Sequence, residues 1–403
     1  MPAIPVKWLR QSTMGGCTQL GTITEGTFIA QLKEFLITGF NPQTPATATY
    51  AGGVVTLTFG SAHGFVPYQV IEVTNAVDTD YNGTFRVVAV EDITAFTLTY
   101  VPDVAPTAST TGVTVKQPPV GGWELVFEDI PNFRMTLKRT HVDATPYYFK
   151  IHNSADYQGG AGSNSWWAWF EIVENYVDET TYDLVQAYAW PASNRYRATD
   201  AESWLFADDR MLYHVVNYAN GTAVPTVICV GDINSVIPGD RGHCISQRVY
   251  YDLTGLASEW DVTTDDIRNY FPRNNDSLHK WMMTQYHNLP GITAWYTMGY
   301  NSSTWGGLLA HPNAANNGMV LSTQPLMVLE NGVRGVTMRG FLPGILEPLN
   351  WSGTLAGQIT SGHPGMESVP VQWIGVTNHI DNALTNAAAP FVIRLDNWRD
   401  QVG

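Results

Sequence analysis

Two pairs of adjacent carboxylates, Asp208–Asp209 and Asp265–Asp266, are the first residues in this chain whose types could do acid–base chemistry. Neighbouring residues of a strand point to opposite faces, so such a pair does not hold a substrate between its two carboxylates. Short carboxylate side chains also accept hydrogen bonds from nearby backbone N–H groups, which is typical of turns and of helix starts. We therefore expect the first pair to close a turn and the second to cap a helix.

Histidine and cysteine residues that could bind a metal lie in two places. His243 and Cys244 follow Asp240 and Arg241, while His279 and His287 are eight residues apart in a stretch with helical periodicity. Neither group brings together the set of ligands that a zinc site needs. The sequence also lacks the common phosphate-binding, nucleophile-elbow, zinc-protease and CxxC motifs. We expect no enzymatic activity, no catalytic residue, no bound metal and no cofactor.

Trp166, Trp167 and Trp169 follow a stretch rich in Gly and Ser at 159–165. In a strand, side chains alternate between the two faces, so Trp167, Trp169 and Glu171 share one face. The opposite face is uniformly apolar and is expected in the core; it carries Trp166, Ala168, Phe170 and Ile172. We expect Trp167 and Trp169 to contact a neighbouring protein. The alternative is that these two rings stack on the sugars of a host-surface glycan.

Composition limits the classes of protein that the chain can represent. The 403 residues include 36 Gly and 23 Pro with 14% charged residues, which favours turn-rich β structure. The net charge of -15 argues against binding to nucleic acid or to anionic membranes. No apolar run of 18 residues and no signal-peptide pattern is present, so we expect no membrane insertion. Cys17, Cys229 and Cys244 lack CxxC spacing, which predicts reduced thiols and folding in a cytoplasm.

A hairpin is predicted at the centre of the chain. The apolar runs 204–207 and 211–216 flank Asp208–Arg210, and Val227–Val230 is apolar enough to be a central strand. The remaining segments are expected to pack around this small sheet.

The first 18 residues are rich in Pro, Gly and Ser and show no periodicity, which predicts an extended arm that docks on another chain. The interface residues expected on this arm are Pro5, Trp8, Leu9 and Met14. A helix should follow over residues 25–37, because apolar residues recur at helical spacing and Gly39 is placed to end it.

Residues 45–117 have the pattern of an inserted Ig-like module. Five short alternating segments predict strands in a small antiparallel sandwich or barrel: 54–59, 69–73, 84–90, 95–100 and 112–116. Segments rich in Pro and Thr flank the module, so we expect it to fold by itself and to move relative to its neighbours.

The fold class that these patterns predict is mainly β and multi-domain, with small antiparallel sandwich or barrel modules and a few short helices. The expected division is an arm and helix (1–44), the inserted module (45–117), a central β domain (118–260) and a loop-rich mixed β domain (261–403). Helices are expected at Asp265–Tyr270 and Leu278–Tyr286. Strands of the last third are expected at 319–321, 326–329, 335–338, 369–376 and 391–395.

Short motifs spread over most of the chain resemble a family of virion structural proteins of tailed bacteriophages. They are Val6–Trp8, Ser12, Met14–Gly16, Leu20–Thr22, Thr38–Phe40, Ala62–Phe65, Tyr81–Gly83, Gly122–Trp123, Trp204–Arg210, Gly231–Ile233, Pro238–Asp240, Arg339–Gly344 and Glu347–Leu349. The chain departs from the family pattern at Gly15–Cys17, where Gly-Ala-Pro is more usual, and Leu253–Asn317 matches no motif of the family.

The resemblance implies a non-enzymatic structural subunit of the virion, assembled in the cytoplasm of the bacterial host. Its place would be the tail or baseplate, or alternatively a head-decoration or collar position. The implied partners are other virion proteins and further copies of the same chain. A glycan-binding receptor module is the alternative from another class. The family brings no catalytic residues to carry over.

Overall fold

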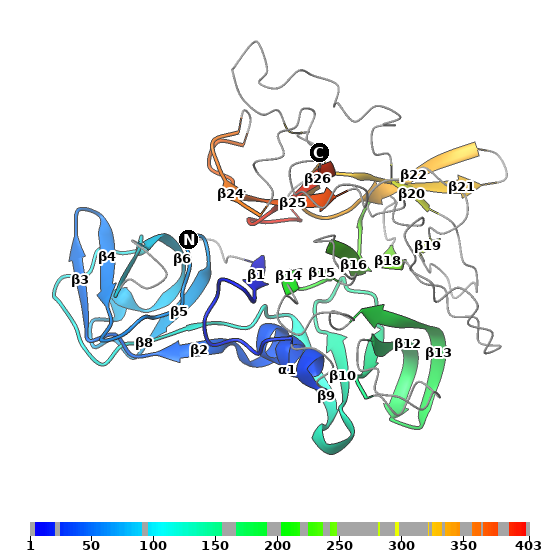
Figure 1. Ribbon diagram of the computed structural model, residues 1–403, viewed down its shortest axis with the longest axis horizontal. Coiled ribbons are helices and arrows are strands. Elements are labelled where there is room, and N and C mark those ends of the chain that lie inside the picture. Colours follow the sequence, from blue (N-terminus) through cyan, green and yellow to red (C-terminus); the bar gives the residue numbers. More distant parts are fainter. Residues whose placement is uncertain are drawn as a thin grey trace, which may run out of the picture.

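The computed structural model describes residues 5–20, 25–90, 96–154, 167–191, 203–217, 225–236, 242–247, 281–282, 295–297, 321, 325–332, 335–346, 357–363, 366–377 and 387–399. Over these residues the protein is mainly β, as the sequence predicts, and it consists of several small antiparallel sheets. Figure 1 shows a module of blue and cyan strands at one end, with green strands at the centre and at the other end. The yellow to red strands of the last third lie on one side of the central sheet.

A six-stranded sheet occupies the centre and contains the predicted hairpin. Its strands, in spatial order, are β1 (Lys7–Arg10), β14 (Ser203–Ala207), β15 (Met211–Asn217), β16 (Pro225–Asp232), β18 (His243–Gln247) and β19 (Trp281–Met282). The hairpin β14–β15 and the central position of β16 confirm the prediction for this region. The strand at Trp281–Met282 contradicts the helix expected over Leu278–Tyr286. The helix expected at Asp265–Tyr270 lies outside the described residues.

A five-stranded sheet packs beside the central one. Its spatial order is β13 (Thr181–Pro191), β12 (Trp167–Asp178), β11 (Tyr148–His152), β10 (Arg134–Arg139) and β9 (Trp123–Asp129). Ala168, Phe170 and Ile172 of β12 are buried in the main core, which confirms the apolar face predicted for this strand. Trp166 lies outside the described residues.

Two four-stranded sheets come from the last third of the chain, with β17 contributed from the middle. The first contains β17 (Asn234–Ser235), β22 (Gly335–Phe341), β21 (Met327–Gly332) and β20 (Trp295–Thr297). The second contains β23 (Ile345–Leu346), β26 (Ala387–Arg394), β25 (Val371–Thr377) and β24 (Ile359–Thr360). Four of these strands overlap the predicted strands of this region.

The N-terminal segment folds onto its own chain, which corrects the expectation of an arm that waits for a partner. β1 pairs with β14, Trp8 opposite Phe206. Trp8, Leu9 and Met14 are at most 3% exposed and belong to the main core, whereas Pro5 is half-buried. Side chains buried in this way have no surface left to offer another subunit, so the proposed interface at Trp8, Leu9 and Met14 is wrong.

The described residues contain one α-helix, α1 (Thr27–Lys33), continued by a π-helical turn, η1 (Glu34–Thr38). Its apolar stripe, with Phe28, Leu32 and Phe35 fully buried, packs in the main core. Gly39 ends the helix with a φ of 74°, and a Cβ there would lie 2.3 Å from the Gln117 carbonyl oxygen. Only glycine meets both conditions without strain, and the helix therefore ends where the sequence predicts.

The insert forms a curled seven-stranded sheet together with β2 (Phe40–Gln43), an edge strand that precedes residue 45. Its spatial order is β2, β8 (Thr114–Gln117), β5 (Val70–Thr74), β6 (Gly83–Val90), β7 (Thr97–Tyr100), β4 (Val54–Thr58) and β3 (Thr47–Ala51), with a 3₁₀ turn η2 (Thr79–Tyr81). The first part of β6 pairs with β5 and its last part with β7, so the sheet folds over its own core. A second 3₁₀ turn, η3 (Ile130–Asn132), follows β9 outside the insert.

The hydrophobic residues divide differently from the predicted segments. One cluster runs from Val6 to Trp398 and takes members from the arm and helix, from the central segment and from the C-terminal segment. Those three segments therefore share one main core, which also includes Val66 of the insert, and the C-terminal segment has a small cluster of its own around Trp373. A separate cluster lies entirely between Ala48 and Val115, inside the insert.

This separate cluster predicts that residues 45–117 fold without the rest of the chain. Expressed alone, they should show dispersed amide resonances and one cooperative thermal transition, because every residue of their core is present. The full-length protein provides the reference spectrum. A collapsed spectrum, or melting without a cooperative transition, would contradict the boundary.

Candidate functional site

Asp208 closes the β14–β15 turn, as the sequence predicts. Its Oδ1 accepts hydrogen bonds from the backbone N–H groups of Arg210 and Met211 at 2.8 and 2.7 Å. The same residue is fully buried, and its backbone carbonyl accepts a bond from Trp123 Nε1. A carboxylate removed from water in this way destabilises the fold unless a cation lies beside it.

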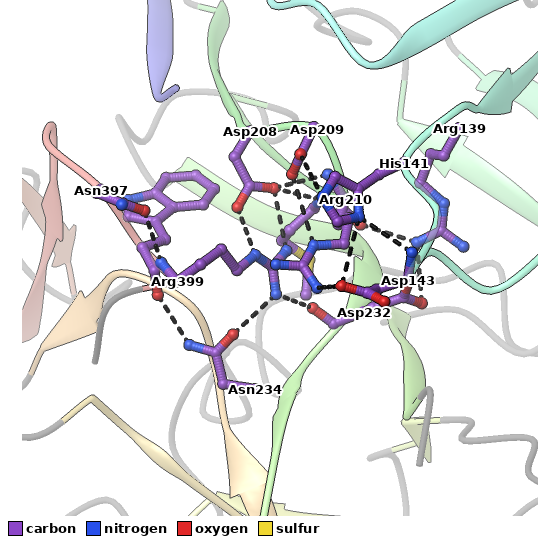
Figure 2. Close-up of polar contacts among 12 residues, drawn as sticks. Arg139, His141, Asp143, Asp208, Asp209, Arg210, Asp232, Asn234, Asn397 and Arg399 are labelled. Atoms are coloured by element: carbon purple, nitrogen blue, oxygen red, sulfur yellow. Dashed lines mark hydrogen bonds and ion pairs between the residues drawn. The ribbon is translucent and has the colours of Figure 1, made fainter. Parts of the chain in front are cut away.

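Arg399 supplies that cation from near the end of the chain (Figure 2). Its Nε donates to Asp208 Oδ2 at 2.7 Å and its Nη2 to Oδ1 at 3.0 Å, which is a two-point contact. Nη1 donates to the Asp232 carbonyl and to Asn234 Oδ1. Burial alone would lower the pKa of Arg399, but the Asp208 carboxylate outweighs it and raises the pKa. The guanidinium therefore stays charged.

Asp232 is the centre of a second buried group, at the end of β16. Thr145 donates to it twice at 2.8 Å, through its N–H and its hydroxyl, and Arg139 Nη1 lies 2.9 Å from Oδ1. His243 Nδ1 is 3.4 Å from the same oxygen. Burial would raise the pKa of Asp232, but the positive charge of Arg139 and the hydrogen bonds lower it below its usual range.

These two groups form one unit, which we name the ionic junction: Arg139, Asp208, Asp232, His243 and Arg399. Arg399 joins them, since it bonds the Asp208 side chain and the Asp232 backbone. Arg139 comes from the five-stranded sheet, Asp232 and His243 from the central sheet, and Arg399 from beyond β26. The junction therefore holds together segments that are far apart in sequence. Nearby charges on its rim, such as Asp143, are far more exposed and contribute less.

In the sequence, His243 and Cys244 are residue types that could bind a metal. The structure places His243 in the ionic junction, and burial lowers its pKa, so its ring is neutral at pH 7. Its Nε2 has no hydrogen-bond partner among the described residues. The side chain of Cys244 lies outside them. Across the described residues, no three His, Cys, Asp or Glu side chains come together as a metal site would require.

Ser203 and His214 form a buried pair that sequence reasoning missed. Ser203 Oγ is 3.0 Å from His214 Nε2, a contact that resembles the start of a nucleophilic site. Trp190 Nε1 can only donate, and it lies 2.8 Å from His214 Nδ1, so Nδ1 must accept. Burial lowers the pKa of His214 to about 3, so the ring is neutral and its single proton is on Nε2.

The rest of the network confirms this direction. Gln31 Nε2 donates to the Thr18 carbonyl, which leaves Gln31 Oε1 free to accept from the Ser203 hydroxyl at 2.8 Å. His214 Nε2 therefore donates a hydrogen bond to Ser203 Oγ, and the serine hydroxyl donates its own hydrogen bond to Gln31 Oε1. A general base must do the reverse. The pair is arranged to satisfy buried polar groups, and it cannot activate the serine as it stands.

The face of β12 that carries Trp169 forms a polar and aromatic cluster. Trp169 is half-buried and its Nε1 donates to Glu171 Oε1 at 3.1 Å. Lys150 lies 3.6 Å from carboxylates of both Glu171 and Glu179, and its Nζ is 3.7 Å from the centre of the Tyr182 ring. Alternation thus correctly separated this face from the core. The side chain of Trp167 lies outside the described residues.

Other residues considered in the sequence analysis fall elsewhere. Asp265, Asp266, His279 and His287 lie outside the described residues. Cys17 and Cys229 are buried thiols, and burial raises the pKa of Cys17 to about 12, which keeps it unreactive. None of the helices in the described part of the chain has the length and apolar character of a membrane span.

Comparisons with known proteins give little further information. No family model matches the chain, and no curated protein matches it. Among solved structures, one match is the phage phi92 endosialidase, with 11% sequence identity and a TM-score of 0.16. The match covers 88% of this chain and 52% of that chain, so this chain spans about half of that protein. A TM-score this low carries no argument about fold or activity.

The two-point contact of Arg399 with Asp208 predicts a large loss of stability in R399A. The substitution leaves a buried carboxylate without its cation, which should lower the free energy of unfolding by about 3–5 kcal/mol. Urea denaturation measures this. R134A removes an exposed arginine and should stay within about 0.5 kcal/mol of wild type. Adding D208N to R399A should recover part of the loss; equal stability of R399A and R134A would contradict the assignment.

His214 predicts a specific pH dependence. The pKa of His214 is about 3 in the folded state and about 6.5 in the unfolded chain. At a pH between these two values, the unfolded chain therefore binds one more proton than the folded protein. The stability that neutral His214 contributes is present above pH 6.5 and is lost as the pH falls toward 3. In H214Q, which can keep both hydrogen bonds, the fall in unfolding free energy between pH 5.5 and 4 should be shallower by about 1.4 kcal/mol per pH unit. An unchanged slope would show that the ring is protonated in the fold.

Proposed function

We propose that this protein is a non-enzymatic structural subunit of a tailed-bacteriophage virion, placed in the tail or baseplate. The non-enzymatic part of the proposal is supported by the way in which the buried polar groups are bonded to one another. The charges of the ionic junction neutralise one another, and His214 donates to Ser203 when catalysis would require it to accept. Such groups stabilise one arrangement of sheets. The virion assignment rests on the sequence motifs that resemble phage structural proteins.

The proposal includes assembly with other virion proteins and with further copies of the chain. Because the N-terminal segment is buried in its own core, the contacts must come from other surfaces. The β12–β13 hairpin is one such surface, because Val177 is 74% exposed and Leu184 is 48% exposed in the half of the hairpin nearer its turn. Exposed apolar side chains beside aromatic residues are typical of subunit contacts.

The test is the location of the protein in purified particles. Cryo-electron microscopy, with mass spectrometry of the same particles, should find the chain in the tail or baseplate in repeated copies. Density at the head surface or the collar would support the alternative position of a decoration or collar protein. Absence from intact particles, in a lysate where the protein is abundant, would overturn the proposal.

A glycan-binding receptor module is the second candidate, and the half-buried Trp169 is the observation that favours it. An indole beside Glu171 and Tyr182 offers both a stacking surface and polar groups for a sugar. In that case W169A should abolish binding of host polysaccharide by the isolated protein while particles still assemble. If Trp169 instead lies in a subunit contact, W169A should reduce incorporation into particles. The wild-type protein should then bind no polysaccharide, and neither should W169A.

A further inference from the structure

The last described residues form a compact turn, which we name the C-terminal strap: residues 395–399. Trp398 Nε1 donates to the Arg394 carbonyl at 2.7 Å, and the Arg399 N–H donates to Asn397 Oδ1 at 2.9 Å. The indole of Trp398 is fully buried and meets the Tyr213 ring edge-on, with centroids 5.3 Å apart. These contacts hold the turn in one shape.

One end of the strap is bound to the ionic junction. Arg399 contacts Asp208 at two points, and Asn234 Nδ2 donates to the Trp398 carbonyl at 2.8 Å. Figure 2 shows Arg399 between Asp208 and Asn234. A displacement of this end would leave Asp208 buried without a cation.

The other end of the strap is bound to the insert. The Leu395 carbonyl accepts a hydrogen bond from Arg86 Nη2 on β6. Arg86 Nη1 donates to the Tyr68 carbonyl at 2.9 Å, and the same carbonyl accepts from Trp8 Nε1. Burial lowers the pKa of Arg86 to about 10, so it remains charged at neutral pH. The strap, the insert and the N-terminal segment thus meet at Tyr68.

A backbone contact between the insert and the N-terminal segment lies near this meeting point. The Gly15 N–H donates to the Gly64 carbonyl at 2.8 Å. A Cβ on either glycine would come within 2.9 Å of the other backbone, so the two segments lie in close contact. The Gly15 amide therefore reports directly on whether the insert remains docked.

We propose that the C-terminal strap is a conformational lock that couples the ionic junction to the docking of the insert. With the strap closed, Arg399 neutralises Asp208 and the Leu395 carbonyl holds Arg86. When the strap opens, both contacts are lost together and the insert is free to change its orientation. This inference does not depend on the virion role, and it revises the expectation that the insert moves freely about its linkers.

The test is hydrogen exchange of full-length protein, read at the Gly15 amide and at the Met211 amide, which donates to Asp208. R399K keeps the charge but loses the two-point contact, and it should speed exchange at Gly15 by about tenfold or more although it does not touch the insert. Coupling is reciprocal, so R86Q should speed exchange at Met211. The exposed-residue control R134A should change neither amide.

Faster exchange at Met211 alone in R399K, with Gly15 as in wild type, would overturn the proposal. If the variants do not fold, wild-type protein in increasing urea decides instead. The two amides should then open in the same transition, with the same dependence on urea. Separate transitions for Gly15 and Met211 would show that the junction and the insert open independently.

Discussion

The contact between Asp208 and Arg399 is the interaction on which the arrangement of the sheets depends. Asp208 closes the β14–β15 turn of the central sheet and is fully buried there, and burial makes its charge unfavourable without a cation. The cation comes from a residue 191 positions later in the chain. The C-terminal segment must therefore be in place before the turn is stable. Arg399 also donates to the Asp232 backbone carbonyl and to Asn234 Oδ1. One guanidinium therefore connects three segments of the chain.

Other buried polar groups also have partners from distant parts of the chain. Asp232 shares its oxygens among Arg139, Thr145 and His243, and Ser203 is bonded between His214 and Gln31. Each of these sites has residue types that enzymes use. The geometry instead gives the Trp190, His214 and Ser203 donors fixed acceptors and leaves the imidazole of His214 neutral. Such networks specify one packing of the sheets.

The sequence alone correctly predicted the features that depend on local chemistry. The stripe that includes Phe28 and Leu32 predicted the helix and its buried face, and Gly39 predicted its end. Alternation predicted which side of β12 enters the core, and the carboxylate of Asp208 predicted the turn. The N-terminal segment was the main error. Its lack of periodicity predicts that it has no core, but a single edge strand needs only a neighbour to pair with.

What the sequence determined, then, is many of the local elements, because hydrogen-bonding turns and the periods of helix and strand involve residues a few positions apart. What only the tertiary structure decided is which distant residues meet. Nothing near Asp208 identifies Arg399 as its partner, and the proton position on His214 is set by Trp190 from another sheet. Charge neutralisation and hydrogen-bond direction act through space, so they become visible only when the fold has brought the partners together.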